Sequence, residues 1–320
     1  MNNNRKLCVA VCICTFKRPA QLSRLLSGLD EQVFASALAV TITIIVVDNS
    51  PQEEGAQVCR DYDGPWQMTY KVEARAGISH ARNTSLSAVP SDCNVVAMID
   101  DDERPEPTWL ANLLDARERS GADIVVGRTT PVFPPATPTW VSDTGFFLKP
   151  QNQEQLADLD SNPPAATCNV MFDAALLHAP GVYFAPEFGP NGGEDKMLFQ
   201  SLKQQGKRFE WAPEARVSEF IPAERAQLSY MLREAYRRGW VINSIKLRLK
   251  SRSTLHSVKI VVKLLLRAVF GIAKNLLLVL LNLVRGRSVW VPFGLNIASN
   301  LGTVAGVLRI PNRHYRRAGA

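Results

Sequence analysis

The sequence predicts an α/β fold in which a mostly parallel sheet is flanked by helices, followed by a basic helical segment. Strand-like and helix-like patterns alternate five times, which is typical of a doubly wound sheet. Polar or charged residues follow the strands, at the edge where such sheets bind their ligands. With 320 residues, the chain is long enough to bury one large core, or one core plus an appendage.

Strands and helices are predicted from the spacing of apolar residues between charges and turns. Leu7–Thr15 is an apolar run of the kind found in buried parallel strands. Pro19 stands where a helix begins, and leucines keep helical spacing after it. The expected strands are residues 7–15, 41–47, 68–73, 94–99 and 123–127, and the expected helices are residues 19–30, 52–62, 78–86 and 107–120.

Four acids in a row, Asp100-Asp101-Asp102-Glu103, directly follow the fourth strand. Adjacent carboxylates repel one another and burial disfavours their charged form, so a strand seldom ends in this way. Bound Mg²⁺ or Mn²⁺ would resolve the conflict, because these ions take oxygen ligands and leave positions open for phosphate. The alternative is a solvated acidic turn before the next helix.

The carboxyl ends of parallel strands meet at one edge of a sheet. Thr15, Asp48 and the acids at 100–102 each follow or end a predicted strand. We therefore expect these side chains to converge on one crevice.

The charge is divided unevenly along the chain. Residues 1–224 carry 19 Lys/Arg and 29 Asp/Glu, whereas residues 225–320 carry 18 Lys/Arg and the single acid Glu234. This division predicts an acidic soluble domain followed by a basic segment that contacts a polyanion, either a membrane or a nucleic acid. The amino terminus has no secretory pattern.

The six cysteines show neither a zinc nor a disulfide pattern. Cys8, Cys12 and Cys14 share one face of a strand, and their C-x-C spacing is not the spacing of zinc ligands. We expect packed free thiols in a reducing cytosol.

Residues 258–284 are strongly apolar but contain Lys259, Lys263, Arg267 and Lys274. On a helix, these four cations fall within an arc of about 80°. An amphipathic helix lying in the membrane interface is predicted rather than a spanning one, because the charges interrupt each long apolar stretch. The alternative is a helix pair that packs on the domain or forms an oligomer.

Residues 289–308 carry no charge but include Pro292 and three glycines, which favours a re-entrant or interfacial hairpin over a spanning helix. In the basic tail as a whole, cations alternate with Leu and Val, which favours a membrane over a nucleic acid. The arginines expected at anionic headgroups are Arg309, Arg313, Arg316 and Arg317.

Five motifs carry a family resemblance: CTFKRP at residues 14–19, DNS at 48–50, GISHARN at 77–83, MIDDDE at 98–103 and GGED at 192–195. Together, and in this order, they resemble the family 2 inverting glycosyltransferases of GT-A fold, particularly bacterial exopolysaccharide enzymes of the succinoglycan glucosyltransferase type. The resemblance covers about residues 7–240.

The resemblance implies roles for the residues near the donor. Asp102 matches the metal-binding acid, with Mn²⁺ or Mg²⁺ as the cofactor, and Asp100 or Asp101 would contact the ribose or a water beyond the metal's ligands. Thr15 and Arg18 belong to the nucleotide-binding side. Glu103 stands where the family usually has a fourth Asp, and its longer stem disfavours direct ligation.

Two further donor-side residues have a structural alternative. Asp48 matches the acid that accepts a hydrogen bond from uracil in relatives, and the alternative is an Asx-turn that caps the next helix; both roles are compatible. Arg82 lies in the segment near the diphosphate, where its donor fork suits phosphate, and the alternative is a surface salt bridge.

On the acceptor side, Asp195 matches the family's catalytic base, and Glu194 would bind the acceptor or orient the loop. The alternative is an acidic helix start favoured by the helix dipole. Arg238 and Trp240 lie where relatives carry a basic-aromatic motif that contacts the diphosphate, against the alternative of a solvated basic helix end. The processive Q-x-x-R-W pattern is absent, which favours the addition of one sugar.

The sequence thus predicts a glycosyltransferase domain at residues 1–225 and a membrane-associating region at residues 226–320. The enzyme would move a sugar from a UDP-sugar to a lipid-linked saccharide with inversion, at the cytoplasmic face of the membrane as a peripheral or monotopic protein. A nucleotidylyltransferase is one alternative, although residues 15–19 lack the glycine-rich loop it requires. The other is a catalytically silent membrane scaffold, which the presence of Asp102 and Asp195 disfavours.

Overall fold

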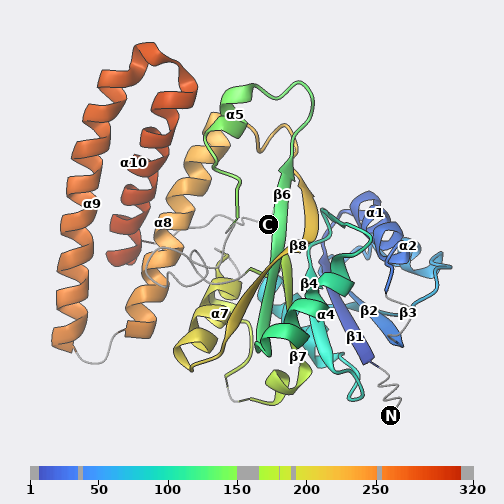
Figure 1. Ribbon diagram of the computed structural model, residues 1–320. Helices are drawn as coiled ribbons and strands as arrows, with labels where there is room; N and C mark the ends of the chain where they lie inside the picture. The colour runs from blue at the N-terminus through green and yellow to red at the C-terminus, as the bar shows by residue number, and fades with distance from the viewer. Residues whose placement is uncertain are drawn as a thin grey trace. The chain divides into compact units, whose positions relative to one another are not determined.

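The structure is a computed structural model that describes residues 7–34, 39–149, 166–179, 181–188, 192–250 and 254–310 (Figure 1). The chain forms two compact units. The first comprises Met1–Pro131, Lys149–Gly189 and Glu194–Phe220, and the second comprises Val132–Leu148, Pro190–Gly193 and Ile221–Ala320.

A mixed sheet of eight strands forms the centre of the first unit, in the order β3-β2-β1-β4-β7-β6-β8-β5 (Figure 1). Its parallel half confirms four predicted strands, because β1 pairs in parallel with β2 and β4, and β2 pairs in parallel with β3. The parallel strands are β1 (Leu7–Thr15), β2 (Val40–Asp48), β3 (Gln67–Val72) and β4 (Val95–Ile99).

The other half of the sheet differs from the prediction. The fifth predicted strand is present as β6 (Ile124–Val132), but the antiparallel strand β7 (Asn169–Asp173) separates it from β4. Neither β7 nor the antiparallel pair β5 (Glu103–Pro105) and β8 (Phe209–Phe220) was predicted. These strands are short, or interrupt their apolar residues with charges and proline, so periodicity did not mark them.

Helices cover both faces of the sheet. Alternate residues of β1 point to opposite sides: Val9 and Val11 pack with α1 and α4, whereas Ala10 packs with α3 and α7. α2 is shorter than predicted because residues 49–55 form a turn that Asp48 closes. The helices of this unit are α1 (Pro19–Asp30), α2 (Ala56–Arg60), α3 (Ile78–Ser87), α4 (Trp109–Ser120) and α7 (Glu194–Gln204), with short 3-10 turns η1 (Ala174–His178) and η2 (Pro186–Phe188).

The prediction of six free thiols is wrong for two cysteines. Cys8 at the start of β1 forms a disulfide with Cys93, which precedes the neighbouring strand β4. The two residues are 85 positions apart, so only the pairing of β1 with β4 brings them together. Cys12, Cys14, Cys59 and Cys168 are free, as predicted.

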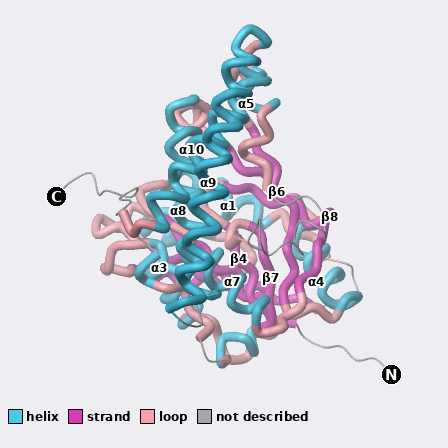
Figure 2. The backbone as a smooth tube through the Cα atoms, turned by 90° about the vertical axis from the view of Figure 1, so that its left-hand side faces the viewer, coloured by secondary structure: helices cyan, strands magenta, loops and turns pink. Residues whose placement is uncertain are grey.

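The second unit is helical (Figures 1 and 2). It contains α5 (Thr139–Asp143), α8 (Leu228–Lys250), α9 (Thr254–Asn282), η3 (Leu283–Arg285) and α10 (Arg287–Val307). In Figure 2, α8, α9 and α10 lie side by side, and α10 contacts both of the others.

The predicted hairpin within residues 289–308 is wrong, because α10 is one helix that runs through Pro292. Its glycines do not form a turn. They allow α10 to approach α8 so closely that a Cβ on Gly302 would lie 1.9 Å from the Tyr236 carbonyl oxygen. Gly306 lies against Trp240 in the same way. Small residues four apart permit such backbone contact between helices.

One side of α9 packs and the other is exposed. Ala268 is buried, and Gly271 lies against Asn300 of α10. Leu266 and Phe270 are 67% and 71% exposed. Among the described residues, Leu255–Arg285 is the one helical stretch long and apolar enough to cross a membrane. The cations Lys259, Lys263, Arg267 and Lys274 are also exposed, and Arg313, Arg316 and Arg317 lie outside the described residues.

Candidate active site

The predicted convergence at the carboxyl edge of the sheet is observed. Thr15, the last residue of β1, lies in register with Asp48, the last residue of β2. The hydroxyl of Thr15 also donates a hydrogen bond to Asp101 Oδ2, at 2.9 Å. One edge of the sheet therefore carries residues from three neighbouring strand ends.

Arg18 links the end of β1 to the acidic run. Its Nη1 donates to Asp101 Oδ1 at 2.8 Å and to Asp102 Oδ2 at 3.0 Å. Burial nevertheless raises the pKa of Asp101 to about 6, because one guanidinium shared by two acids offsets only part of the cost of removing a carboxylate from water. The acidic run is therefore not a solvated turn: Asp101 and Glu103 are buried.

Glu103 lies beneath the run, on β5, and is 3% exposed. Its Oε2 accepts a hydrogen bond from the backbone amide of Asp100 at 3.1 Å, whereas its buried Oε1 has no hydrogen-bond partner in the part of the chain that the structure describes. Burial, together with the charge of Asp100, raises the pKa of Glu103 well above its ordinary value. This carboxyl supports the backbone of the run rather than pointing out of it.

The donor set fits a hard divalent cation. Asp100, Asp101 and Asp102 present carboxylate oxygens within three consecutive residues, and the side chain of Asp102 is more exposed than that of Asp101, at 15% against 5%. A ligand approaching from solvent therefore reaches Asp102 more readily than Asp101. Oxygen-only donors of this kind suit Mg²⁺ and Mn²⁺.

Arg82 joins the acidic run to Glu194, which lies 112 residues further along the chain and is followed by Asp195. Its Nη1 pairs with Glu194 Oε1, and its Nη2 lies 3.3 Å from Asp100 Oδ1. The side chain is 9% exposed, and its guanidinium lies over the ring of Phe184. Arg82 therefore forms a buried ion pair, not the surface salt bridge that was the alternative. Its contact with a diphosphate stays a prediction.

Glu194 and Asp195 begin α7 and differ in their surroundings. Glu194 is 2% exposed and contacts Arg82, whereas Asp195 is half-buried. Gly192 and Gly193, with φ of 71° and 100°, precede them in the left-handed region that favours glycine. The acidic helix start is thus observed, and Glu194 contacts Arg82. A role for Glu194 in orienting this loop remains a prediction. The assignment of Asp195 as the base remains a prediction.

Asp48 is fully buried and closes a turn. Its Oδ1 accepts from the Ser50 amide at 2.8 Å, and its Oδ2 accepts from the Gly55 amide at 2.8 Å and from the Tyr70 hydroxyl at 3.2 Å. The Asx-turn alternative is therefore observed, and the uracil contact stays a prediction. Sequence reasoning missed Tyr70, because its strand carries no chemical motif.

Asn49 was also missed as a positioning residue. Its amide donates to the carbonyls of Glu73 and Arg75, and its Oδ1 accepts from the Gly77 amide at 2.9 Å. These bonds tie the end of β2 to the start of the helix that carries Arg82.

Arg238 and Trp240 lie in the second unit, in the interior of α8, so the solvated helix end is wrong. Arg238 contacts Glu234 at 3.0 Å and stacks on Phe146, 4.2 Å from the ring centroid. The indole of Trp240 donates to the Ile310 carbonyl at 2.9 Å. Their contact with a diphosphate remains a prediction.

Comparison with known families is consistent with this geometry. The model of the family described as "Glycosyl transferase family 2" matches residues 10–179, more than half of the chain, and includes every predicted donor-side residue of the first unit. The chain belongs to glycosyl transferase family 2. This glycosyltransferase is 28% identical to the succinoglycan biosynthesis protein ExoM of Rhizobium meliloti over 242 residues, which are 74% of each chain.

A second relative resembles a smaller part of this family 2 glycosyltransferase. The glucosyl-dolichyl phosphate glucuronosyltransferase of Haloferax volcanii is 31% identical over 141 residues, which are 44% of this chain and 42% of the relative.

Solved structures confirm the GT-A fold expected from the resemblance. The mannosyltransferase PcManGT from Pyrobaculum calidifontis, solved with GDP-Man and Mn²⁺, matches with a TM-score of 0.63 and 17% identity, covering 95% of this chain and 88% of that one. S. aureus TarS, solved with UDP, matches with a TM-score of 0.54 and 15% identity, over 95% and 91% of the two chains.

Proposed function

We propose that this glycosyltransferase is metal-dependent and inverting, and that it moves a sugar from a UDP-sugar to a lipid-linked saccharide during the synthesis of a surface polysaccharide. The observation that carries the proposal is the bridge made by Arg82, which brings Asp100 and Glu194 to a single guanidinium. The donor-side acids Asp100–Asp102 and the pair Glu194-Asp195 therefore belong to one site. The similarity to ExoM supports the polysaccharide.

On the acceptor side, Asp195 is the base. Its carboxylate accepts the proton of the acceptor hydroxyl as the hydroxyl oxygen bonds to the anomeric carbon. The bond from that carbon to the diphosphate oxygen breaks on the opposite face, so the configuration inverts. Glu194, which contacts Arg82, fixes the start of α7 and with it the direction of Asp195.

On the donor side, Asp102 would hold Mn²⁺ or Mg²⁺, with Asp100 and Asp101 beside it. The chemistry supplied there would be neutralisation of the charge on the departing diphosphate without a proton transfer. Arg18 keeps Asp101 and Asp102 in place, and Thr15 fixes the second oxygen of Asp101. Asp48 and Arg82 provide the predicted nucleotide and diphosphate contacts of the first unit, and the diphosphate contacts of Arg238 and Trp240 stay predictions.

The donor test measures release of nucleoside diphosphate by the purified full chain in detergent. UDP-sugars and GDP-sugars are both offered, since TarS was solved with UDP-GlcNAc and PcManGT with GDP-Man. We expect release with a UDP-sugar plus Mn²⁺ or Mg²⁺, and none with EDTA. Donor binding without release for any sugar, with lipid-linked saccharide present, would favour the silent scaffold.

We also propose that α9 places the enzyme on the cytoplasmic face of the membrane as a monotopic protein. Its exposed apolar side and exposed cations suit the interface between headgroups and acyl chains. Replacing Lys259, Lys263, Arg267 and Lys274 by Gln should weaken binding to anionic vesicles by about 1 kcal/mol for each charge.

The matched control for this membrane test removes four exposed cations from the first unit. It replaces Arg24, Arg60, Lys71 and Arg119 by Gln and should leave vesicle binding nearly unchanged. Equal loss in both variants would mean that net charge, rather than α9, directs binding.

A further inference from the structure

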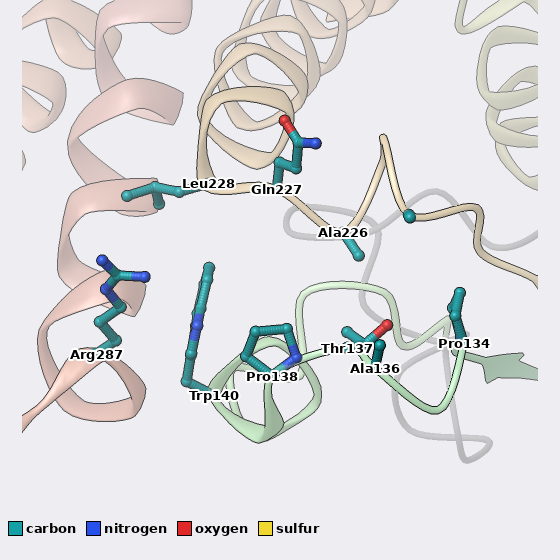
Figure 3. A pocket seen from close by; sticks show the side chains of 10 residues that line it. Pro134, Ala136, Thr137, Pro138, Trp140, Ala226, Gln227, Leu228 and Arg287 are labelled. Atoms are coloured by element: carbon teal, nitrogen blue, oxygen red, sulfur yellow. The ribbon is translucent and has the colours of Figure 1, made fainter.

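A cavity of about 360 Å³ opens within the second unit, and none of the site residues assigned above lines it (Figure 3). Three segments line it: the stretch around α5, the turn that leads into α8, and the first residue of α10. The wall is mostly apolar, with Pro134, Pro138 and Leu228 among its residues. Its size lies within the usual range of small-molecule sites, about 300–1,000 Å³.

Two polar groups in this wall have no partner among the residues that the structure describes. The indole nitrogen of Trp140 is buried and has no hydrogen-bond partner there. The guanidinium of Arg287 lies 5.7 Å from the centroid of the same indole and forms no ion pair with any residue that the structure describes. Figure 3 shows the indole between Arg287 and Pro138. A buried donor without a partner costs free energy, which a ligand that accepts its hydrogen bond recovers.

The charge of the surrounding chain selects an anion. The second unit has 18 Lys/Arg and three acids, Asp143, Glu224 and Glu234. The two oxygens of Glu234 accept hydrogen bonds from Arg237 and Arg238. Cations therefore far outnumber acids in the unit that contains Arg287. A planar guanidinium beside an indole donor matches the oxygens of a phosphate group.

The position of Arg287 in the sequence favours a lipid as the ligand of this cavity. It begins α10 two residues after Arg285, the last residue of the apolar stretch Leu255–Arg285. The end of an apolar membrane helix lies at the level of the headgroups, where Trp and Arg are common. An occupant with a phosphate at Arg287 and an apolar part against the prolines and Leu228 satisfies both sides of the wall.

We propose that this cavity binds the head group of an anionic phospholipid of the bilayer, with its phosphate on Arg287 and Trp140 Nε1. The proposal shares the membrane location proposed for α9 but does not depend on sugar transfer. Asp195→Asn should therefore bind the lipid as the wild type does, so failure of one proposal leaves the other testable.

The test measures binding of dihexanoyl phosphatidylglycerol, below its micelle concentration, to the full chain in a non-ionic detergent by calorimetry. Arg287→Gln should weaken binding by about 10-fold or more, as expected for loss of a charge-assisted hydrogen bond. Trp140→Phe keeps the ring and removes the donor, and should weaken binding by about 2- to 10-fold. Arg285→Gln, which removes the same charge two residues away, should change it by less than about 2-fold.

Four results would overturn the proposal. Equal loss in Arg287→Gln and Arg285→Gln would indicate attraction to net charge only. Equally tight binding of dihexanoyl phosphatidylcholine would remove the preference for an anionic lipid, and equally tight inorganic phosphate would indicate a simple anion site. Binding of farnesyl phosphate alone would assign the cavity to a carrier lipid. Should Arg287→Gln unfold, Trp140→Phe and Arg287→Lys, which keeps the charge, carry the same comparison.

Discussion

The two units of the chain treat charge in opposite ways. At the site of the first unit, each arginine pairs with two acids. Arg18 forms ion pairs with Asp101 and Asp102. Arg82 forms ion pairs with Asp100 and Glu194. In the second unit, Glu234 alone serves both Arg237 and Arg238, and the remaining cations are largely on the surface. Under the proposed function, a metal ion would balance the acids of the first unit, and an anionic membrane surface would balance the cations of the second.

The same contrast concerns what keeps each unit folded. A buried ion pair contributes little by its presence, but removing one partner leaves an uncompensated charge away from water. The first unit depends on such a pair at its site. The second unit depends more on backbone contact between α8 and α10, which glycines allow.

The largest effect on stability should come from breaking the buried pair of the first unit. Arg82→Met leaves Glu194 buried without its main partner, and we expect the free energy of unfolding to fall by about 3–5 kcal/mol. Urea titration followed by circular dichroism measures it. The control is Arg119→Met, which removes a pair whose two side chains are 69% and 63% exposed and should cost less than about 1 kcal/mol. Similar losses in free energy of unfolding for the two variants would contradict the claim that the buried ion pair holds the first unit together.

Acid should destabilise the second unit through Glu234. Burial alone would raise the pKa of this carboxyl, but its bonds from Arg237 and Arg238 lower it from 4.5 to about 2. A depressed pKa means that the stabilisation is complete above pH 4.5 and is lost as the pH falls toward 2. The contribution is of order 3 kcal/mol.

Unfolding of the wild type and of Glu234→Gln between pH 5 and pH 2 measures this contribution. The variant should lose less stability over that interval. An equal pH slope in the two proteins would contradict the assignment.

A smaller effect is expected at the contact between α8 and α10. Gly302→Ala places a methyl group 1.9 Å from the Tyr236 carbonyl, and overpacking of this kind costs about 1–3 kcal/mol. Gly294→Ala on the same helix meets its nearest atom at 3.9 Å and should be neutral or stabilising by about 0.4–1 kcal/mol. Thermal unfolding of the two variants separates them. Equal melting temperatures would show that glycine packing does not hold this unit together.

The sequence predicted the parallel half of the sheet because β1, β2 and β4 are rich in apolar and β-branched residues, and the shorter, more polar β3 follows β2 at a suitable interval. The helix Pro19–Asp30 was predicted with both of its ends, since Pro19 marks the start and leucines keep the period. Strands β7 and β8 were missed because antiparallel pairing across a long interval leaves no local signal. The disulfide between Cys8 and Cys93 was missed for the same reason, as spacing along the chain does not report neighbouring strands.

The site was predicted more fully in its residues than in their contacts. Thr15, Arg18 and Asp100–Asp102 gather as expected. However, no pattern in the sequence distinguishes an arginine that contacts phosphate from one that joins two carboxylates, so the bridge through Arg82 emerged only from the fold. The glycines of α10 were interpreted as helix breakers for a comparable reason. The α8 backbone that they contact is far away in the sequence, so their packing role leaves no local pattern.

The most direct test of the central claim compares Asp102→Asn with Asp195→Asn in one pair of assays, Mn²⁺-dependent binding of the UDP-sugar and release of UDP. If one site joins a metal-binding acid to a base, Asp195→Asn keeps donor binding and loses transfer by about 10²–10⁴-fold. Asp102→Asn loses the metal-dependent part of donor binding and transfer together. Full transfer activity in Asp195→Asn, or unchanged metal-dependent donor binding in Asp102→Asn, would contradict the account.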